Sequence, residues 1–190
     1  MIIYIHGFSS HGISCKAKIL KEGLIKFGVI SPSLSYIPDL AIDTLKQLIN
    51  SYLKYEKVYL IGSSLGGYYA LYLSDYFQIP AILINSSLNP SSSLKKYLGN
   101  KNINYYDNST FEWNLKHLKQ LRKYNIQNIN SNLYLLLTQK GDEILNYKEA
   151  VRKLKDSQQL IREGGNHRFD NLENEIISIK KFLEKSLLNT

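Results

Sequence analysis

The chain has 190 residues, of which 44% are hydrophobic and 21% are charged, and it contains a single cysteine, Cys15. This length and composition fit one soluble domain with a buried core, and a lone cysteine excludes both a disulfide framework and a cysteine-cluster metal site. The net charge of +8 raises the question of nucleic-acid binding, but the lysines are scattered and no nucleic-acid motif accompanies them. We therefore expect a solvated basic surface and no nucleic-acid partner.

The first residues form a short apolar run without a basic leader, and no window holds the roughly 18 uninterrupted apolar residues of a membrane span. We expect a cytoplasmic protein without a membrane partner. The sequence pattern does not predict an oligomeric state.

Short apolar runs recur along the chain and predict buried strands. They are Ile2 to Ile5, Val29 to Ile30, Val58 to Ile61, Ala81 to Ile84, Leu133 to Leu137 and, more weakly, Gln159 to Ile161. Helical patterns lie between them and at the end of the chain, on Ala17, Leu20, Leu24 and Phe27; Ala41, Leu45, Leu48 and Tyr52; Tyr147, Ala150, Val151 and Leu154; and Ile176, Ile179, Leu183 and Leu187. This alternation predicts an α/β fold of three layers, in which helices cover both faces of a mainly parallel sheet of about six strands.

One segment, residues 86–131, is far longer than a connection between neighbouring strands needs, and it contains a helical pattern around Phe111 to Leu121. We expect it to be a small cap inserted into a single domain that spans residues 1–190. Four aromatic side chains of this segment either wall an apolar acyl pocket or pack the cap onto the body. They are Tyr105, Tyr106, Phe111 and Trp113.

A serine in the motif Gly62-Ser63-Ser64-Leu65-Gly66-Gly67 carries the strongest chemical signal. The motif follows the third predicted strand and precedes the helical run Leu65 to Phe77, which is the context of a G-x-S-x-G nucleophile elbow. Glycine at Gly62 and Gly66 lets the neighbouring backbone approach closely. Only Ser64 has glycine at both second neighbours, so Ser64 is the predicted nucleophile.

A serine nucleophile needs a base, and imidazole suits this role near neutral pH. His167 lies in a glycine-containing loop after the last predicted strand and before the C-terminal helix, where it can reach over the edge of the sheet. His117 falls in the cap, where we expect it to be exposed, and His11 falls in an early loop with a structural or solvated role. His167 is the predicted base.

The base in turn needs a carboxylate that fixes its tautomer. Asp142 follows the fifth predicted strand, and the chain order Ser64, Asp142, His167 is that of nucleophile-elbow enzymes. Gly-Asp is also a common turn pair, so a plain turn remains an alternative for Asp142. Glu143 is the nearest substitute, whereas Asp170 lies too close to His167 along the chain to reach its ring easily.

An oxyanion hole needs backbone N–H donors aimed at the charge that develops on the substrate carbonyl. We expect the backbone N–H of Leu65, directly after the predicted nucleophile, to be one donor. We expect the N–H of Phe8, in the loop after the first strand, to be the other, because Gly7 permits an unusual turn there. We expect His6 to brace this loop rather than to act as a base.

No metal or nucleotide site competes with this arrangement in the sequence. His6 and His11 lack a third ligand, and the loop Gly62 to Gly67 lacks the Lys-Ser/Thr ending of a phosphate-binding loop. We predict no metal and no cofactor.

Six motifs spread over nearly the whole chain occur together in one bacterial family. They are Tyr4-Ile5-His6-Gly7-Phe8, Lys16-Ala17, Gly62-Ser63-Ser64-Leu65-Gly66-Gly67-Tyr68-Tyr69-Ala70, Tyr97-Leu98-Gly99, Gly141-Asp142-Glu143 and Glu163-Gly164-Gly165-Asn166-His167. In these motifs the chain resembles the YqiA-type esterases. The resemblance implies a compact α/β-hydrolase fold that lacks the first strands of that fold, with Ser64, Asp142 and His167 at the triad positions.

Two loops depart from that family's pattern. Ser9 stands where an asparagine usually follows His-Gly-Phe, and residues 85–90 replace an Asn-Pro-Ala run that ends in Arg-Pro. If that arginine positions substrate in the family, the specificity of this chain differs.

The resemblance also implies carboxylesterase activity on short acyl esters, and together with the three predicted catalytic residues it leads us to expect a serine carboxylesterase that hydrolyses short to medium acyl esters through an acyl-enzyme intermediate. Its expected partner is a small acyl ester or thioester. Two alternatives stay open: an acyl-CoA thioesterase with the same triad, and a non-catalytic binding protein with the same fold.

Overall fold

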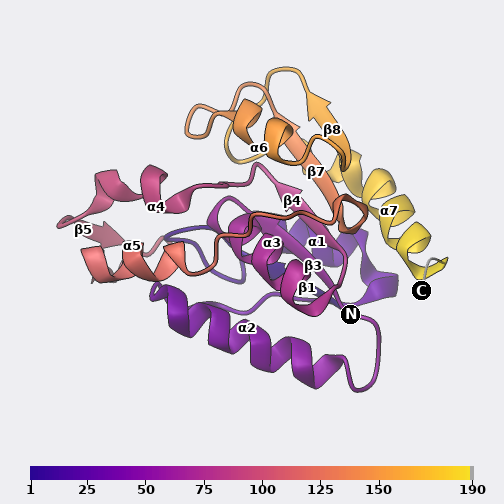
Figure 1. Ribbon diagram of the computed structural model, residues 1–190, viewed down its shortest axis with the longest axis horizontal. Helices are drawn as coiled ribbons and strands as arrows, with labels where there is room; N and C mark the ends of the chain where they lie inside the picture. The colour runs from indigo at the N-terminus through magenta and orange to yellow at the C-terminus, as the bar shows by residue number, and fades with distance from the viewer. Residues whose placement is uncertain (189–190) are drawn as a thin grey trace.

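The computed structural model describes residues 1–188, and its centre is a six-stranded sheet in which every pairing is parallel (Figure 1). In spatial order the strands are β2 (Val29–Ile30), β1 (Ile2–Ile5), β3 (Tyr59–Ser63), β4 (Ala81–Ile84), β7 (Tyr134–Gln139) and β8 (Gln158–Arg162). Each coincides, within two residues at either end, with an apolar run of the sequence. The four central strands are fully buried, as expected for a sheet with helices on both faces.

Helices cover the two faces of the sheet and create two separate hydrophobic cores. The helices are α1 (Cys15–Gly23), α2 (Pro38–Tyr52), α3 (Leu65–Phe77), α6 (Tyr147–Lys153) and α7 (Ile176–Leu188). One core joins Ile3 and Leu60 to side chains of α2, α3 and α6, whereas the other joins Ile2 and Ile61 to side chains of α1 and α7. Successive strand residues point to opposite faces, so one strand contributes to both cores. The predicted three-layer α/β class is confirmed.

Residues 86–131 connect β4 to β7 and contain α4 (Pro90–Ser93), β5 (Lys101–Ile103), β6 (Thr110–Glu112) and α5 (Leu115–Arg122). The expected helix around Phe111 is wrong at its start, because Phe111 belongs to β6, which pairs antiparallel with β5. The helix begins only after Asn114, whose side chain accepts the free N–H groups of Lys116 and His117. Four short 3-10 helices also occur along the described residues: η1 (Ile25–Phe27), η2 (Lys95–Tyr97), η3 (Ser131–Leu133) and η4 (Leu172–Glu175).

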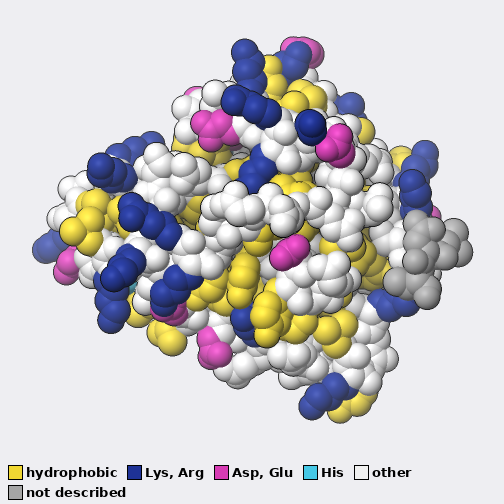
Figure 2. All heavy atoms as spheres, in the orientation of Figure 1, with side chains coloured by type: hydrophobic (Ala, Val, Ile, Leu, Met, Phe, Trp, Pro, Cys, Tyr) yellow, Lys and Arg dark blue, Asp and Glu magenta, His cyan; other side chains and the backbone are white. Residues whose placement is uncertain are grey.

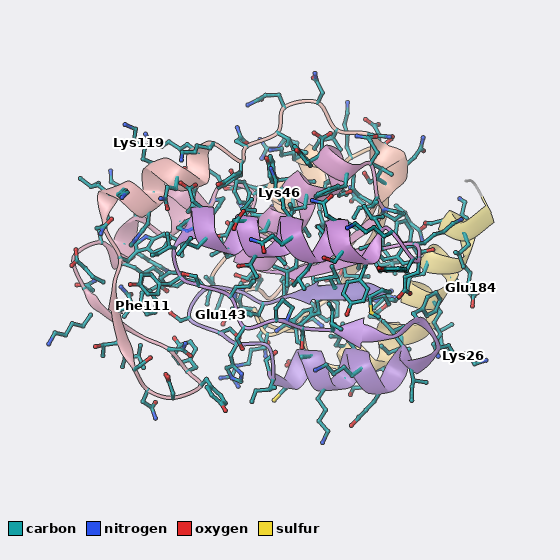
Figure 3. All side chains as sticks on the ribbon, turned by 90° about the horizontal axis from the view of Figure 1, so that it is seen from below. Lys26, Lys46, Phe111, Lys119, Glu143 and Glu184 are labelled. Atoms are coloured by element: carbon teal, nitrogen blue, oxygen red, sulfur yellow. The ribbon has the colours of Figure 1, made fainter. Side chains whose placement is uncertain are left out.

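The inserted segment packs against the body through apolar side chains and through polar contacts, among them a bond from Tyr68 Oη to the carbonyl oxygen of Leu121 at 2.8 Å. Leu94, Trp113 and Leu121 belong to the same hydrophobic core as Tyr69 of α3. Asp39 of α2 also accepts hydrogen bonds from residues just after α5, at 2.6 Å from Tyr124 Oη and 2.7 Å from Lys123 Nζ. Figure 3 shows Phe111 and Lys119 of this segment at the opposite end of the molecule from Glu184 of α7.

The order of the strands places a crevice between β1 and β3. From β1 the chain crosses to β2 on one side, and from β3 it crosses to β4 on the other side. The loops that leave the carboxyl ends of β1 and β3 therefore diverge, and ligands of open α/β sheets bind in the crevice at such a reversal. Within residues 1–188, no helix is both long enough and apolar enough to cross a membrane.

Candidate active site

Ser64 occupies the sharp turn between β3 and α3. Its backbone has φ 55° and ψ −120°, a combination that costs a non-glycine residue on the order of 1–3 kcal/mol. The flanking glycines make the turn possible, since a Cβ at Gly62 would lie 2.2 Å from the carbonyl oxygen of Gly66. A Cβ at Gly66 would lie 2.0 Å from the carbonyl oxygen of Ile5. Both glycines are therefore required by close backbone contacts, as the elbow motif predicts.

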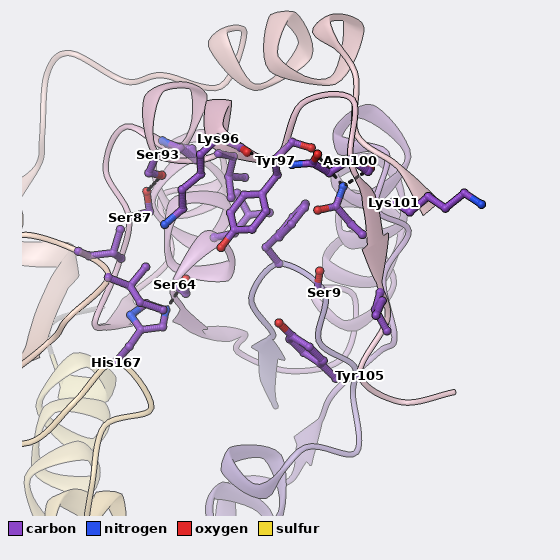
Figure 4. Close-up of a pocket in the computed structure, with 18 residues that line it drawn as sticks. Ser9, Ser64, Ser87, Ser93, Lys96, Tyr97, Asn100, Lys101, Tyr105 and His167 are labelled. Atoms are coloured by element: carbon purple, nitrogen blue, oxygen red, sulfur yellow. Dashed lines mark hydrogen bonds between the residues drawn. The ribbon is translucent and has the colours of Figure 1, made fainter. Parts of the chain in front are cut away.

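His167 reaches Ser64 from the loop that follows β8. Its Nε2 atom lies 3.0 Å from Ser64 Oγ, and its side chain is 17% exposed (Figure 4). The backbone N–H of His167 donates to Glu143 Oε2 at 2.9 Å. The structure thus brings the predicted base to the predicted nucleophile. Glu143, which the sequence offered as the alternative to Asp142, contacts the backbone of His167 and not its ring.

Asp142 lies beneath the imidazole, and its side chain is only 1% exposed. The Nδ1 atom of His167 is 2.9 Å from Oδ2 and 3.0 Å from Oδ1, and the N–H groups of Ile144 and Leu145 also donate to Oδ1. Burial raises the pKa of this carboxyl, but the hydrogen bonds from the imidazole and the two amides outweigh burial and hold the pKa below its ordinary value. The carboxylate is thus a pure acceptor, which puts a proton on Nδ1 and leaves the lone pair of Nε2 facing Ser64.

The loop after β1 lies against Ser64. A Cβ at Gly7 would be 3.1 Å from the Ser64 Cβ, so only glycine lets the loop approach this closely. In the described part of the chain, neither the Phe8 N–H nor the Leu65 N–H donates a hydrogen bond. Leu65 is the first residue of α3, where N–H groups have no partner within the helix. These are the two amides that the sequence predicts as oxyanion donors.

His6 holds this loop in place through both ring nitrogens. Leu34 N–H donates to Nε2 at 2.9 Å, and Nδ1 lies 2.9 Å from the carbonyl oxygen of Gly7. Because a backbone N–H can only donate, Nε2 must be the acceptor, and Nδ1–H donates to Gly7. Burial lowers the pKa of His6, although its bond to Gly7 opposes this effect. In these contacts His6 is a neutral group that ties the loop to Leu34.

Two buried amides, which the sequence analysis did not single out, hold the loop that carries His167. Asn85, at the end of β4, donates to the carbonyl oxygens of Asn166 and His167 at 2.9 and 3.3 Å, and accepts from the N–H of Gln139 at 2.9 Å. The side chain of Gln139 accepts from the N–H groups of Asn166 and Asp170 at 3.1 and 2.9 Å. Asn85 is 2% exposed and Gln139 is 5% exposed. Asn85 has a positive φ of 40°, a conformation that asparagine adopts more readily than most residues.

The remaining histidines and Asp170 lie outside the chain of contacts that joins Asp142, His167 and Ser64. The Asp170 carboxylate accepts both of its bonds from the side chain of Asn166, and His11 packs against Tyr106. His117 is buried rather than exposed, because its ring packs against Trp113 and Tyr36, and its Nδ1 accepts the N–H of Asn114 at the start of α5. Within residues 1–188, no group of three or more His, Cys, Asp or Glu side chains is arranged to hold a metal ion.

A pocket of about 400 Å³ opens beside Ser64 and His167 (Figure 4). The elbow and the loop after β1 form one side, and the inserted segment forms most of the rest. Of the four aromatic residues singled out there, Tyr105 lines this pocket and Phe111 lines a smaller adjacent pocket of about 230 Å³. Trp113 is fully buried against the ring of Phe8, and Tyr106 lines neither pocket. These aromatic residues thus divide between the two roles that the sequence left open.

The architecture and the elbow define an α/β hydrolase fold. The chain matches the model of an uncharacterised protein family, UPF0227, over residues 1–184, and it belongs to this family, which confirms the resemblance seen in the sequence motifs. Solved structures agree with the fold. The alpha/beta hydrolase domain-containing protein 10 from mouse is 18% identical with a TM-score of 0.76, and the match covers 97% of this chain and 89% of that protein.

Two microbial structures extend the comparison. Est1E from Butyrivibrio proteoclasticus, solved with ferulic acid bound, is 16% identical with a TM-score of 0.74, covering 98% of this chain and 89% of Est1E. A monoacylglycerol lipase from Paleococcus ferrophilus is 14% identical with a TM-score of 0.68, covering 97% of this chain and 94% of the lipase. At these identities, the likeness establishes the shared fold.

Proposed function

We propose that this protein is a serine carboxylesterase that hydrolyses short to medium acyl esters. The observation that carries the proposal is the continuous chain of contacts from Asp142 through His167 to Ser64. Beside the serine lie two backbone N–H groups, of Phe8 and Leu65, that donate no hydrogen bond in the described part of the chain. The pocket of about 400 Å³ is large enough for an acyl group of modest size. The esterase and the lipase among the structural neighbours support the same class.

Acylation starts when Ser64 Oγ attacks the ester carbonyl carbon while its proton moves to Nε2 of His167. The Asp142 carboxylate, already bonded to Nδ1, stabilises the imidazolium that forms. The N–H groups of Phe8 and Leu65 donate to the oxyanion of the tetrahedral intermediate. Its collapse breaks the bond to the alcohol oxygen, which takes the proton from Nε2 and leaves, so that the acyl group remains on Ser64.

Deacylation repeats the sequence with water as the nucleophile. His167 accepts a proton from water, the hydroxide oxygen bonds to the acyl carbon, and the same two amides stabilise the second oxyanion. Collapse returns the proton to Ser64 Oγ and releases the carboxylic acid. Residues 86–131 form most of the pocket wall, so in this proposal they act as a cap on a single domain and set the acyl size.

The test is hydrolysis of p-nitrophenyl esters of graded acyl length by the wild type, Ser64→Ala and His167→Ala. Each substitution is expected to lower kcat on the order of a million-fold, because the nucleophile and its base act as a unit. The matched control is His11→Gln, which changes a histidine away from the triad and keeps activity. Appreciable turnover in Ser64→Ala, with circular dichroism showing an intact fold, would refute the proposal.

A further inference from the structure

The pocket beside Ser64 has a charge imbalance that the ester chemistry does not require. Among its 18 lining residues are Lys96 and Lys101, but none is aspartate or glutamate. The other polar groups of the lining are hydroxyls, amides and the imidazole of His167. The negative charge of Asp142 is already bonded to that imidazole and two amides. A substrate in this pocket therefore meets positive charge without a competing carboxylate.

The two lysines are placed differently with respect to the nucleophile. Figure 4 shows the Lys96 side chain extending from the η2 turn toward the end of the pocket that holds Ser64 and His167, whereas Lys101 extends away from it. In the described part of the chain, Lys96 makes no ion pair, and its ammonium lies 5.3 Å from the ring centre of Tyr97. Lys96 is an exposed residue, and its ammonium thus lies near an aromatic ring at the rim of the pocket without an anionic partner from the described part of the protein.

The surroundings of the pocket add to the same field. Residues 86–131 carry seven lysine and arginine side chains against two acidic ones, so they hold a net charge of +5 out of +8 for the whole chain. In Figure 2 these cationic side chains gather on the end of the molecule that α4, β5 and α5 form in Figure 1. Charge of one sign around a concave site attracts ligands of the opposite sign and raises their local concentration.

We propose that Lys96 forms an anion subsite, and that the natural substrates are acyl esters that carry a carboxylate or phosphate within reach of it. This inference rests on the proposed esterase function and narrows its substrate class. The anionic group belongs either to the acid half or to the alcohol half of the ester. A subsite of this kind orients the ester carbonyl toward Ser64, because it fixes a second point of the substrate.

Two pairs of matched esters test the proposal. On the alcohol side, 4-acetoxybenzoate is compared with neutral 4-acetoxybenzamide, and on the acid side the p-nitrophenyl monoester of adipic acid is compared with p-nitrophenyl hexanoate. Within each pair the members have similar shape and differ in charge. The readout is the ratio of kcat/KM for the anionic ester to that for the neutral ester, and the pair with the larger ratio shows which half carries the charge.

Lys96→Gln is expected to lower the ratio of the preferred pair by about tenfold, equivalent to about 1.4 kcal/mol. The matched control is Lys95→Gln, which removes the same charge from the adjacent residue outside the pocket lining and leaves the ratio within about twofold. In the wild type the ratio also falls as salt is added, because ions screen the attraction.

The proposal is overturned if neither pair shows a preference for the anionic ester, or if Lys95→Gln lowers the ratio as much as Lys96→Gln. Binding to Ser64→Ala, measured by calorimetry with the same esters, separates this failure from failure of the esterase function. If the wild type hydrolyses none of the esters but Ser64→Ala binds the anionic ones through Lys96, the esterase function fails and the anion subsite stands. Equal affinity of Ser64→Ala for the anionic and the neutral ester of each pair would contradict the anion subsite.

Discussion

The Nε2 atom of His167 lies 3.0 Å from Ser64 Oγ, although 103 positions separate the two residues along the chain. The contact follows from the strand order, because β3, β4, β7 and β8 are successive neighbours and all run parallel. The loops after these strands meet at one edge of the sheet, where Asn85 at the end of β4 bonds to the loop after β8. The sheet thus brings Ser64 and His167 together through backbone geometry.

Replacing Asp142 by asparagine is expected to lower kcat for a p-nitrophenyl ester by about ten-thousandfold. The amide NH₂ would donate toward Nδ1, which moves the imidazole proton to Nε2 and blocks acceptance of the Ser64 proton. Glu143→Gln is the matched control, because it removes one negative charge at the next residue, and Glu143 accepts from the backbone N–H of His167 rather than from its ring. A loss in Glu143→Gln as large as in Asp142→Asn would contradict the assigned role of Asp142.

Replacing Asn85 by alanine is expected to lower the free energy of unfolding by about 2–3 kcal/mol, because buried backbone groups lose their partners. Asn85→Asp keeps the acceptor for the Gln139 N–H but cannot donate to the His167 loop, so its kcat falls while KM changes little. Denaturant titration and steady-state kinetics measure the two effects. Exposed Asn89→Ala serves as the control in the same loop. Wild-type kcat in Asn85→Asp would show that Asn85 does not position the base.

His6 is expected to make stability depend on pH. Its pKa in the folded protein lies below the ordinary 6.5, so the unfolded chain binds the proton more tightly and acid favours unfolding. The contribution is fully present above about pH 6.5 and is lost as the pH falls toward the lowered pKa. His6→Gln, which keeps a neutral acceptor for the Leu34 N–H, removes this term.

The measurement for His6 is the denaturant midpoint of both proteins at several values between about pH 5 and pH 8. The wild type is expected to lose more stability on acidification than His6→Gln. Asp142 and His117, whose pKa values are also lowered, are common to both proteins and cancel in the comparison. Parallel stability curves would mean that His6 is not the responsible group.

The sequence predicts well those parts that depend on local pattern. Buried parallel strands read as continuous apolar runs, and the elbow glycines are needed wherever strand and helix backbones meet this closely. The positions of Asp142 and His167 could also be predicted, because each follows a recognisable strand and the chain order is restrictive.

Other features depend on contacts between distant segments and were not predicted. Asn85 and Gln139 are ordinary polar residues at the ends of their strands. Only the fold brings both side-chain amides to the loop that carries His167. The β5–β6 hairpin was missed because its strands have three residues each and show little apolar alternation. Trp113 could equally have lined a pocket, and its burial against Phe8 is decided by tertiary packing.

The most direct test of the central claim is the intact mass of the protein after reaction with a serine-directed fluorophosphonate, followed by peptide mapping. The account predicts one adduct per chain, located on Ser64, absent from Ser64→Ala and formed much more slowly by His167→Ala. A folded wild-type protein that forms no adduct, or one that forms it on another serine, would contradict the assignment of Ser64 as an activated nucleophile.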